Sequence, residues 1–193
     1  MTRRIGTWCR GGHLVAALVG AIVVLSGWLS GPASAGSARE IDTSVDEALV
    51  RFEKEVKDGK IFLESSKGVL VFPSVLKGGL GIGAEEGEGA LRIAGKTVDY
   101  YSTAAASIGL QAGGQVKTVF VVFLEEGALK RFRESEGWKA GVDGSIALVT
   151  LGAGGAIDTE TLKDPIVGFV FGQKGLMYNL TFEVTRFTKL DMR

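Results

Sequence analysis

Glycines recur at alternate positions in the first half of the chain. After the apolar run Val69–Phe72 and a proline, Gly79, Gly81 and Gly83 are separated by single aliphatic residues. In an extended chain these glycines would share one face of a strand, because successive side chains point to opposite faces. Glycine costs backbone entropy in a strand and offers nothing to pack. A close-packing glycine face therefore predicts sharp curvature, or the close approach of another backbone or a ligand.

The N-terminal 35 residues have the pattern of a secretory signal peptide. Three arginines lie within the first ten residues, and an apolar run of 16 residues covers Leu14–Leu29. Ala33-Ser34-Ala35 then forms an A-x-A cleavage site. The run is short for a membrane span, which needs about 20 residues, although a retained anchor is the alternative. We expect cleavage near Ala35 and a periplasmic or secreted protein, exported by the Sec route or by the twin-arginine route.

Removal of residues 1–35 changes the charge balance of the chain. Three of the 22 basic residues and none of the 22 acidic residues lie in that segment, which leaves 19 against 22 and a net charge of −3. The remaining 158 residues suffice for one domain, which we place at 43–193 after a flexible leader at 36–42. Without bulk positive charge we expect no nucleic-acid partner, and any anion must bind at a local patch.

The rest of the chain lacks histidine and cysteine, since His13 and Cys9 both lie in the signal segment. This excludes a histidine-dependent triad, a cysteine nucleophile and nearly every zinc, copper or haem site. Glu85, Glu86 and Glu88 lack the spacing of a calcium-binding loop and are expected in a solvated turn. We therefore expect no enzyme, no catalytic residue, no metal and no cofactor, with an enzyme built on carboxylates, Lys, Tyr and Ser as the remaining alternative.

Hydrophobic periodicity predicts an α+β, β-rich fold. Apolar residues at helical spacing indicate a helix over Thr43–Lys57, which we expect to dock on the core, with a helix on a membrane surface as the alternative. A second short helix is expected over Glu125–Arg133. Many short strands between glycine-rich turns favour a single curved antiparallel sheet, barrel- or sandwich-like. The strands are expected at 69–72, 80–84, 90–93, 97–101, 104–111, 116–124, 144–151, 166–171 and 176–188.

Several basic residues flank predicted strand ends or lie along the second helix. If some of them converge, they would form a pocket for a phosphate group or a lipid headgroup. These candidate lipid-binding residues are Lys67, Lys77, Lys117, Lys130, Arg131 and Arg133.

Four separated motifs resemble the SYLF domain, a lipid-binding module that is also described as a yeast-type actin-regulator domain. The bacterial exported members look most similar, through Asp99-Tyr-Tyr-Ser-Thr and the segment 137–143. The similarity runs in the family's order from about residue 43 to the C-terminus. Val184 departs from the pattern, because relatives tend to have glycine after the glutamate that stands here at position 183. The four motifs are Lys67-Gly-Val-Leu-Val-Phe-Pro, Lys77-Gly-Gly-Leu-Gly-Ile-Gly, Ser107-Ile-Gly-Leu-Gln-Ala-Gly-Gly-Gln and Gly175-Leu-Met-Tyr-Asn-Leu.

The resemblance implies a β-rich single domain with an N-terminal helix, and the binding to phosphoinositide-type or other anionic lipids that eukaryotic members show. Actin binding belongs to eukaryotic relatives, and we expect no actin partner for an exported protein. We thus expect a non-enzymatic module that recognises anionic lipid headgroups at an envelope membrane. The alternative is a structural protein of the envelope that binds a protein partner, or a second copy of itself, through its glycine-rich face.

Overall fold

The computed structural model describes residues 37–150 and 164–192, without the side chains of 178–184. The described residues belong to one compact unit, Gly36–Arg193. The predicted signal peptide lies outside them. The first helix, α2 (Ala38–Glu55), begins within the segment predicted as a leader, because Ser37 and Glu40 form a reciprocal capping box.

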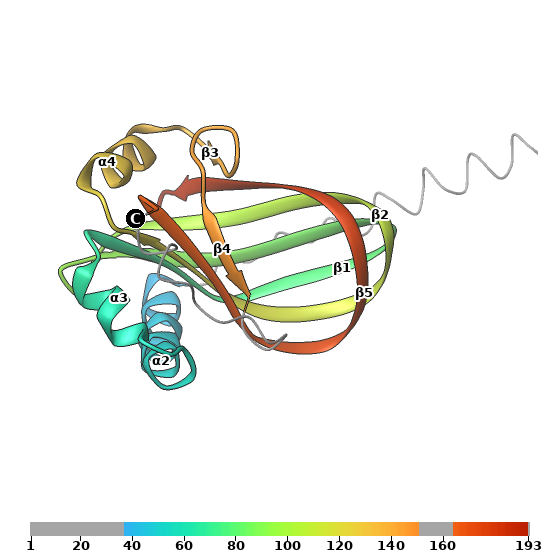
Figure 1. The fold of residues 1–193 in the computed structure, drawn as a ribbon, viewed down its shortest axis with the longest axis horizontal. Coiled ribbons are helices and arrows are strands. Elements are labelled where there is room, and N and C mark those ends of the chain that lie inside the picture. The colour runs from blue at the N-terminus through green and yellow to red at the C-terminus, as the bar shows by residue number, and fades with distance from the viewer. Residues whose placement is uncertain (1–36, 151–163, 193) are drawn as a thin grey trace, which may run out of the picture. The chain divides into compact units, whose positions relative to one another are not determined.

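Three long strands make up most of the sheet (Figure 1). They are β1 (Gly68–Ile93), β2 (Lys96–Phe123) and β5 (Ile166–Leu190), and each pairs antiparallel with the next in the order β1-β2-β5. Two short strands complete the sheet, β3 (Trp138–Lys139) and β4 (Ala147–Thr150), of which β4 runs parallel to β5. The predicted curved, β-rich α+β fold is confirmed, although each long strand joins stretches that were predicted as separate strands.

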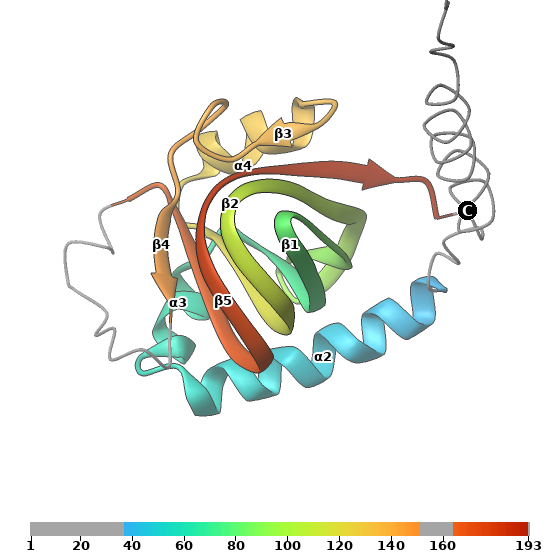
Figure 2. The same cartoon turned by 90° about the vertical axis from the view of Figure 1, so that its right-hand side faces the viewer.

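Each long strand folds back on itself, so that the three strands form nested curves with β1 innermost (Figure 2). The two limbs of β1 lie in direct contact: a Cβ atom on Gly87 would come within 2.8 Å of the Ser74 carbonyl oxygen. Gly81 has a φ of 72° at an irregularity between Leu80 and Ile82, where the chain changes direction. The left-handed backbone conformation at this position favours glycine.

The irregularity at Gly81 changes the expected arrangement of the alternate glycines. A Cβ atom on Gly79 would lie 2.6 Å from the Cα atom of Gly83, so these two glycines pack against each other across the fold-back. Gly81 itself has open space around it. The three glycines therefore form a tight bend rather than one flat face, because β1 turns back on itself at Gly81 and brings Gly79 against Gly83.

Helix α2 covers the outer face of the sheet at one end. Its apolar residues Ile41, Val45, Ala48 and Phe52 are buried, and the Phe52 ring stacks on Phe120 at 4.4 Å between centroids. The interpretation of this helix as one that docks on the core is confirmed. These buried apolar residues face the sheet, so they do not face a membrane surface.

A second helix, α3 (Gly59–Ser65), follows α2 and was not predicted. Asp58, at a φ of 59°, turns the chain after α2, and a new helix begins at Gly59. Phe62 anchors it by contacting Phe169 at 4.9 Å between ring centroids. No helix among the described residues is long and apolar enough to cross a membrane.

Helix α4 (Glu126–Glu134) closes the other side of the same end, close to its predicted position. Its residues Ala128, Leu129 and Phe132 join a second core between the limbs of the sheet. This core includes Trp138, which contacts Phe132 at 5.7 Å between ring centroids. The described helices thus cover one end of the sheet, and the fold-back lies at the other end (Figure 1).

Candidate functional site

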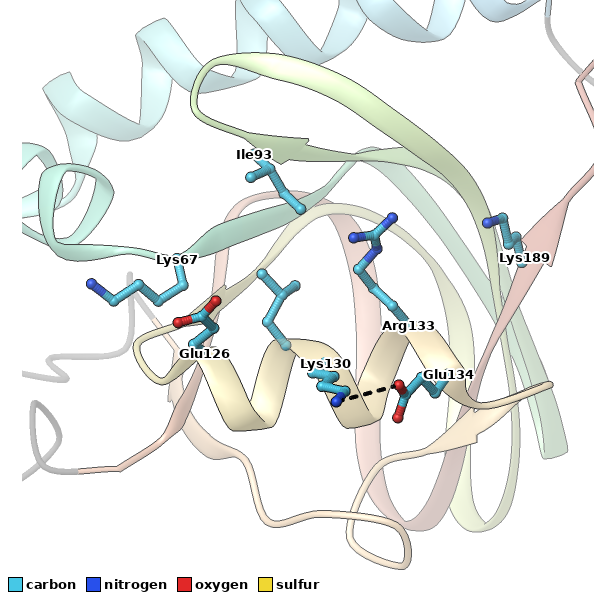
Figure 3. Close-up of a pocket in the computed structure, with 8 residues that line it drawn as sticks. Lys67, Ile93, Glu126, Lys130, Arg133, Glu134 and Lys189 are labelled. Carbon is cyan, nitrogen blue, oxygen red and sulfur yellow. Dashed lines mark ion pairs between the residues drawn. The ribbon is translucent and has the colours of Figure 1, made fainter.

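A cleft of about 640 Å³ lies between α4 and the ends of the long strands (Figure 3). It brings together three of the six basic residues predicted to bind lipid, and it adds a fourth, Lys189, which the sequence did not single out. Ile93 and Leu129 give the cleft an apolar part. Its lining residues are Lys67, Ile93, Glu126, Leu129, Lys130, Arg133, Glu134 and Lys189.

Two of the lysines in the cleft are available to an anion. The Lys130 ammonium lies 3.9 Å from Glu134, and both side chains are largely exposed. Such surface pairs contribute little to stability and exchange partners readily. Lys67 is exposed and forms no ion pair with any described residue. The side chains in Figure 3 show Lys67 and Lys130 on opposite sides of Glu126.

Asp99 holds the other two cations of the cleft. Arg133 Nε donates a hydrogen bond of 3.3 Å to Asp99 Oδ2, and Lys189 forms an ion pair with Asp99 Oδ1. The Asp99 side chain is mostly buried, whereas Arg133 and Lys189 keep about half of theirs exposed. One carboxylate therefore orients two cations, and the cleft carries more positive than negative charge.

Tyr101 lies in the core next to Asp99 and Arg133. Its side chain is buried and packs against Phe132 at 5.0 Å between ring centroids, and its hydroxyl has no hydrogen-bond partner among the described residues. Burial and, after it, the nearby Asp99 carboxylate raise the pKa of Tyr101 to about 12, while Arg133 opposes the shift. Tyr101 therefore stays neutral at physiological pH and acts as part of the core.

Lys77 and Lys117 lie elsewhere, inside the curl of the sheet near the fold-back. The ammonium of Lys117 is 2.8 Å from Glu85 Oε2, and that of Lys77 is 3.8 Å from the same oxygen. The Lys77 and Glu85 side chains are buried, and that of Lys117 is 14% exposed. Glu85 was expected in a solvated turn, and the structure corrects this: β1 continues through it, and the two-residue period turns its side chain inward.

The interior of the fold-back holds further polar contacts. Gln111 Nε2 donates to the Ser107 carbonyl at 3.0 Å, and Ser107 Oγ donates to Gln111 Oε1 at 2.8 Å. A cavity of about 230 Å³ adjoins Glu85 and Lys117 and is otherwise mostly apolar. Arg131, the sixth predicted residue, is exposed on α4 and does not line the cleft.

The outer surface of the fold-back is mostly aliphatic, with the exposed Lys174 opposite Val116 at its border, and the sequence interpretation missed this surface. We call it the bend face. The signal was present, since aliphatic residues separate the glycines of this region and sharp curvature was predicted there, but the sequence did not indicate that these aliphatic residues face outward. The bend face consists of Leu76 (54% exposed), Leu80 (83%), Ile82 (72%), Ile108 (71%), Leu110 (67%), Val116 (38%) and Leu176 (90%).

Comparison with known families identifies the second half of this sheet. Residues 104–191 match the family model of Ysc84, described as Las17-binding protein actin regulator. Over these residues the chain is similar to the Ysc84 (SYLF) family. The predicted resemblance is confirmed over this range, which contains two of the four motifs, Ser107–Gln115 and Gly175–Leu180. No curated protein matches the chain.

The match to the SYLF family model supports a lipid-binding or actin-regulator-like module. The matched range contains α4 with Lys130 and Arg133, the buried Lys117, and most of the bend face. Lys67 and Lys77 lie on or before β1, outside the matched range. Among the described residues no cluster of carboxylates could hold a metal ion.

Proposed function

We propose that this SYLF domain is an exported, non-enzymatic module that binds anionic lipid headgroups at an envelope membrane. The cleft beside α4 is the observation that carries the proposal, because four basic side chains surround it and two of them are not held by a buried carboxylate. The phosphoinositide-like specificity and the periplasmic or secreted location are part of the same proposal and rest on the family and on the signal-like N-terminus.

The chemistry of the cleft suits a phosphorylated headgroup. Lysine ammonium groups bind phosphate oxygens as mobile point charges, and the planar guanidinium of Arg133 offers two parallel donors. Asp99 pre-orients Arg133, which lowers the entropy lost when an anion is bound. The apolar side chains of Ile93 and Leu129 would contact the glycerol and first methylenes of the lipid.

Vesicle flotation of the full chain tests the proposal. The variant Lys67→Gln/Lys130→Gln removes the two available lysines, and Lys60→Gln/Arg131→Gln is its control. Lys60 matches Lys130 because it also forms an exposed pair four residues along a helix, with Glu64 at 3.8 Å. Phosphatidylcholine vesicles are compared at low salt with vesicles that also contain phosphatidylglycerol or a phosphoinositide.

We expect the parent chain to prefer anionic vesicles. Each lysine near an anionic surface contributes about 1 kcal/mol, so the cleft variant should lose roughly tenfold or more in affinity. The control variant should lose less, although its net charge is the same. Equal losses in the two variants, or a parent without anionic preference, would contradict the proposal.

A further inference from the structure

We propose that the bend face enters the hydrocarbon of one leaflet of a lipid bilayer. The inference rests on the proposed function in one respect, the membrane as partner, but it concerns a different surface. The cleft lies at the helix-covered end of the sheet, and the bend face lies at the other end (Figure 1).

The polarity of the sheet is inverted at the fold-back. Lys77 and Glu85 point inward and are 2% and 6% exposed, whereas their near neighbours Leu80 and Ile82 point into solvent. Exposing aliphatic side chains to water is unfavourable in proportion to their area, and a contiguous exposed patch marks an interaction surface. The inversion is understandable if an apolar medium covers the outer surface.

The small size of the bend face argues against a second copy of the chain as that medium. A stable protein interface uses about 20 to 30 residues on each side, and the bend face comprises seven described residues. These residues surround a convex fold-back, where two rigid copies would touch over a limited area.

The edge of β1 is also protected against pairing with another chain. Pro73 lacks an N–H group, the register shifts between Phe72 and Val75 and again at Gly81, and Lys77 points inward. Bulges, prolines and inward-pointing charges are the devices that prevent edge strands from pairing. These features favour bilayer hydrocarbon over the edge strand of another chain as the partner of the bend face.

The dimensions of the bend face fit shallow insertion. From Leu80 back to Leu76 the first limb of β1 extends about 13 Å, at 3.3 Å per residue, before it reaches the exposed Ser74. The second limb reaches the exposed Glu86 four residues after Ile82, whereas Ser74 lies six residues before Leu80. Half of the bilayer hydrocarbon is about 15 Å thick. Insertion would therefore stop within one leaflet, with Ser74 and Glu86 near the headgroups.

Site-specific labels test the proposal on the full chain. Cys9→Ser removes the native thiol, and single cysteines then carry the polarity-sensitive fluorophore NBD at Ile82 or Leu176. Val142 and Val50 provide control sites, and Val142 matches Ile82 in exposure, at 71% against 72%. Vesicles contain phosphatidylcholine and phosphatidylglycerol, with or without phosphatidylcholine that bears a doxyl quencher on its acyl chain. The N-terminal segment is identical in all four proteins, so it cannot produce a difference between sites.

We expect doxyl lipid to quench the labels at Ile82 and Leu176 at least twofold more than those at Val142 and Val50. Vesicle-bound protein whose labels at Ile82 and Leu176 are not quenched would overturn the inference. So would a dimer in sedimentation that Ile82→Ser converts to monomer, because the occupant would then be a second copy. Quenching without anionic preference would defeat the proposed headgroup site alone, and anionic preference without quenching would defeat this inference alone.

Discussion

The two ends of the same three strands differ in what covers their outer surface. At the helix-covered end, Val71 and Phe120 face outward and are buried under α2. At the fold-back the outward residues Leu80 and Ile82 are exposed, and charges occupy the inside. At both ends successive side chains alternate between the two faces of the sheet, so this alternation alone does not determine which face is exposed to solvent. What covers the outward residues therefore distinguishes the two ends: α2 covers them at one end, and no described element covers them at the fold-back.

The largest effect should come from the interior of the fold-back. Glu85→Gln removes the carboxylate that both Lys77 and Lys117 contact, and breaking a buried ion pair costs about 3–5 kcal/mol. Urea denaturation measures the free energy of unfolding, and Glu86→Gln, at the adjacent exposed position, should change it by less than about 0.5 kcal/mol. A small effect of Glu85→Gln would show that the interior charges are solvated.

The second prediction concerns the helix-covered end. Leu70 is fully buried in the core between the limbs, so Leu70→Ala should lower the free energy of unfolding by about 3 kcal/mol through lost burial and a cavity. The same denaturation experiment applies. A loss below about 1 kcal/mol would mean that this end is as loosely packed as an exposed surface.

Alkaline pH should weaken the helix-covered end through Tyr101. The unfolded chain releases this proton near pH 10, whereas in the folded state the pKa is about 12. The neutral tyrosine thus stabilises the fold fully below pH 10, and we expect about 2–3 kcal/mol to be lost as the pH rises from 10 to 12.

Tyr101→Phe isolates this contribution from the titration of lysines in the same range. The variant should lose less stability than the parent between pH 9 and pH 12. It should match or exceed the parent at neutral pH, because it removes a buried hydroxyl without a partner. Parallel pH curves for the two proteins would contradict the assignment.

The smallest effect on stability should come from the bend face itself. Leu80→Ala repeats the Leu70 substitution on the same strand, but it should change the free energy of unfolding by less than about 0.5 kcal/mol. A large loss would mean that Leu80 packs against the chain, which would remove the contrast between the two ends.

The sequence was sufficient for the local features. Helical periodicity located α4 and most of α2, and the apolar runs Val69–Phe72 and Val116–Leu124 located buried strand segments. It was insufficient for the continuity of the strands, because proline and glycine between short runs look like turns when the pairing partner is unknown. Lys77 was placed at a strand end for this reason, although β1 runs through it.

The composition of the cleft was also only partly predictable from the sequence. Lys67, Lys130 and Lys189 are far apart in sequence, and only the antiparallel pairing of the long strands, with α4 packed across them, brings them to one place. The spacing of charges could nominate three of its basic residues, but it could not separate them from Arg131 on the same helix or from the buried Lys117.

Vesicle binding of two variants across salt and lipid charge tests the central claim most directly, that the two ends meet a membrane by different forces. Lys67→Gln/Lys130→Gln should lose only the binding that needs anionic lipid, which salt also screens because the Debye length is about 8 Å at physiological ionic strength. Ile82→Ser should instead weaken binding to phosphatidylcholine vesicles and binding that persists at high salt. Identical losses in both variants under every condition would contradict the account.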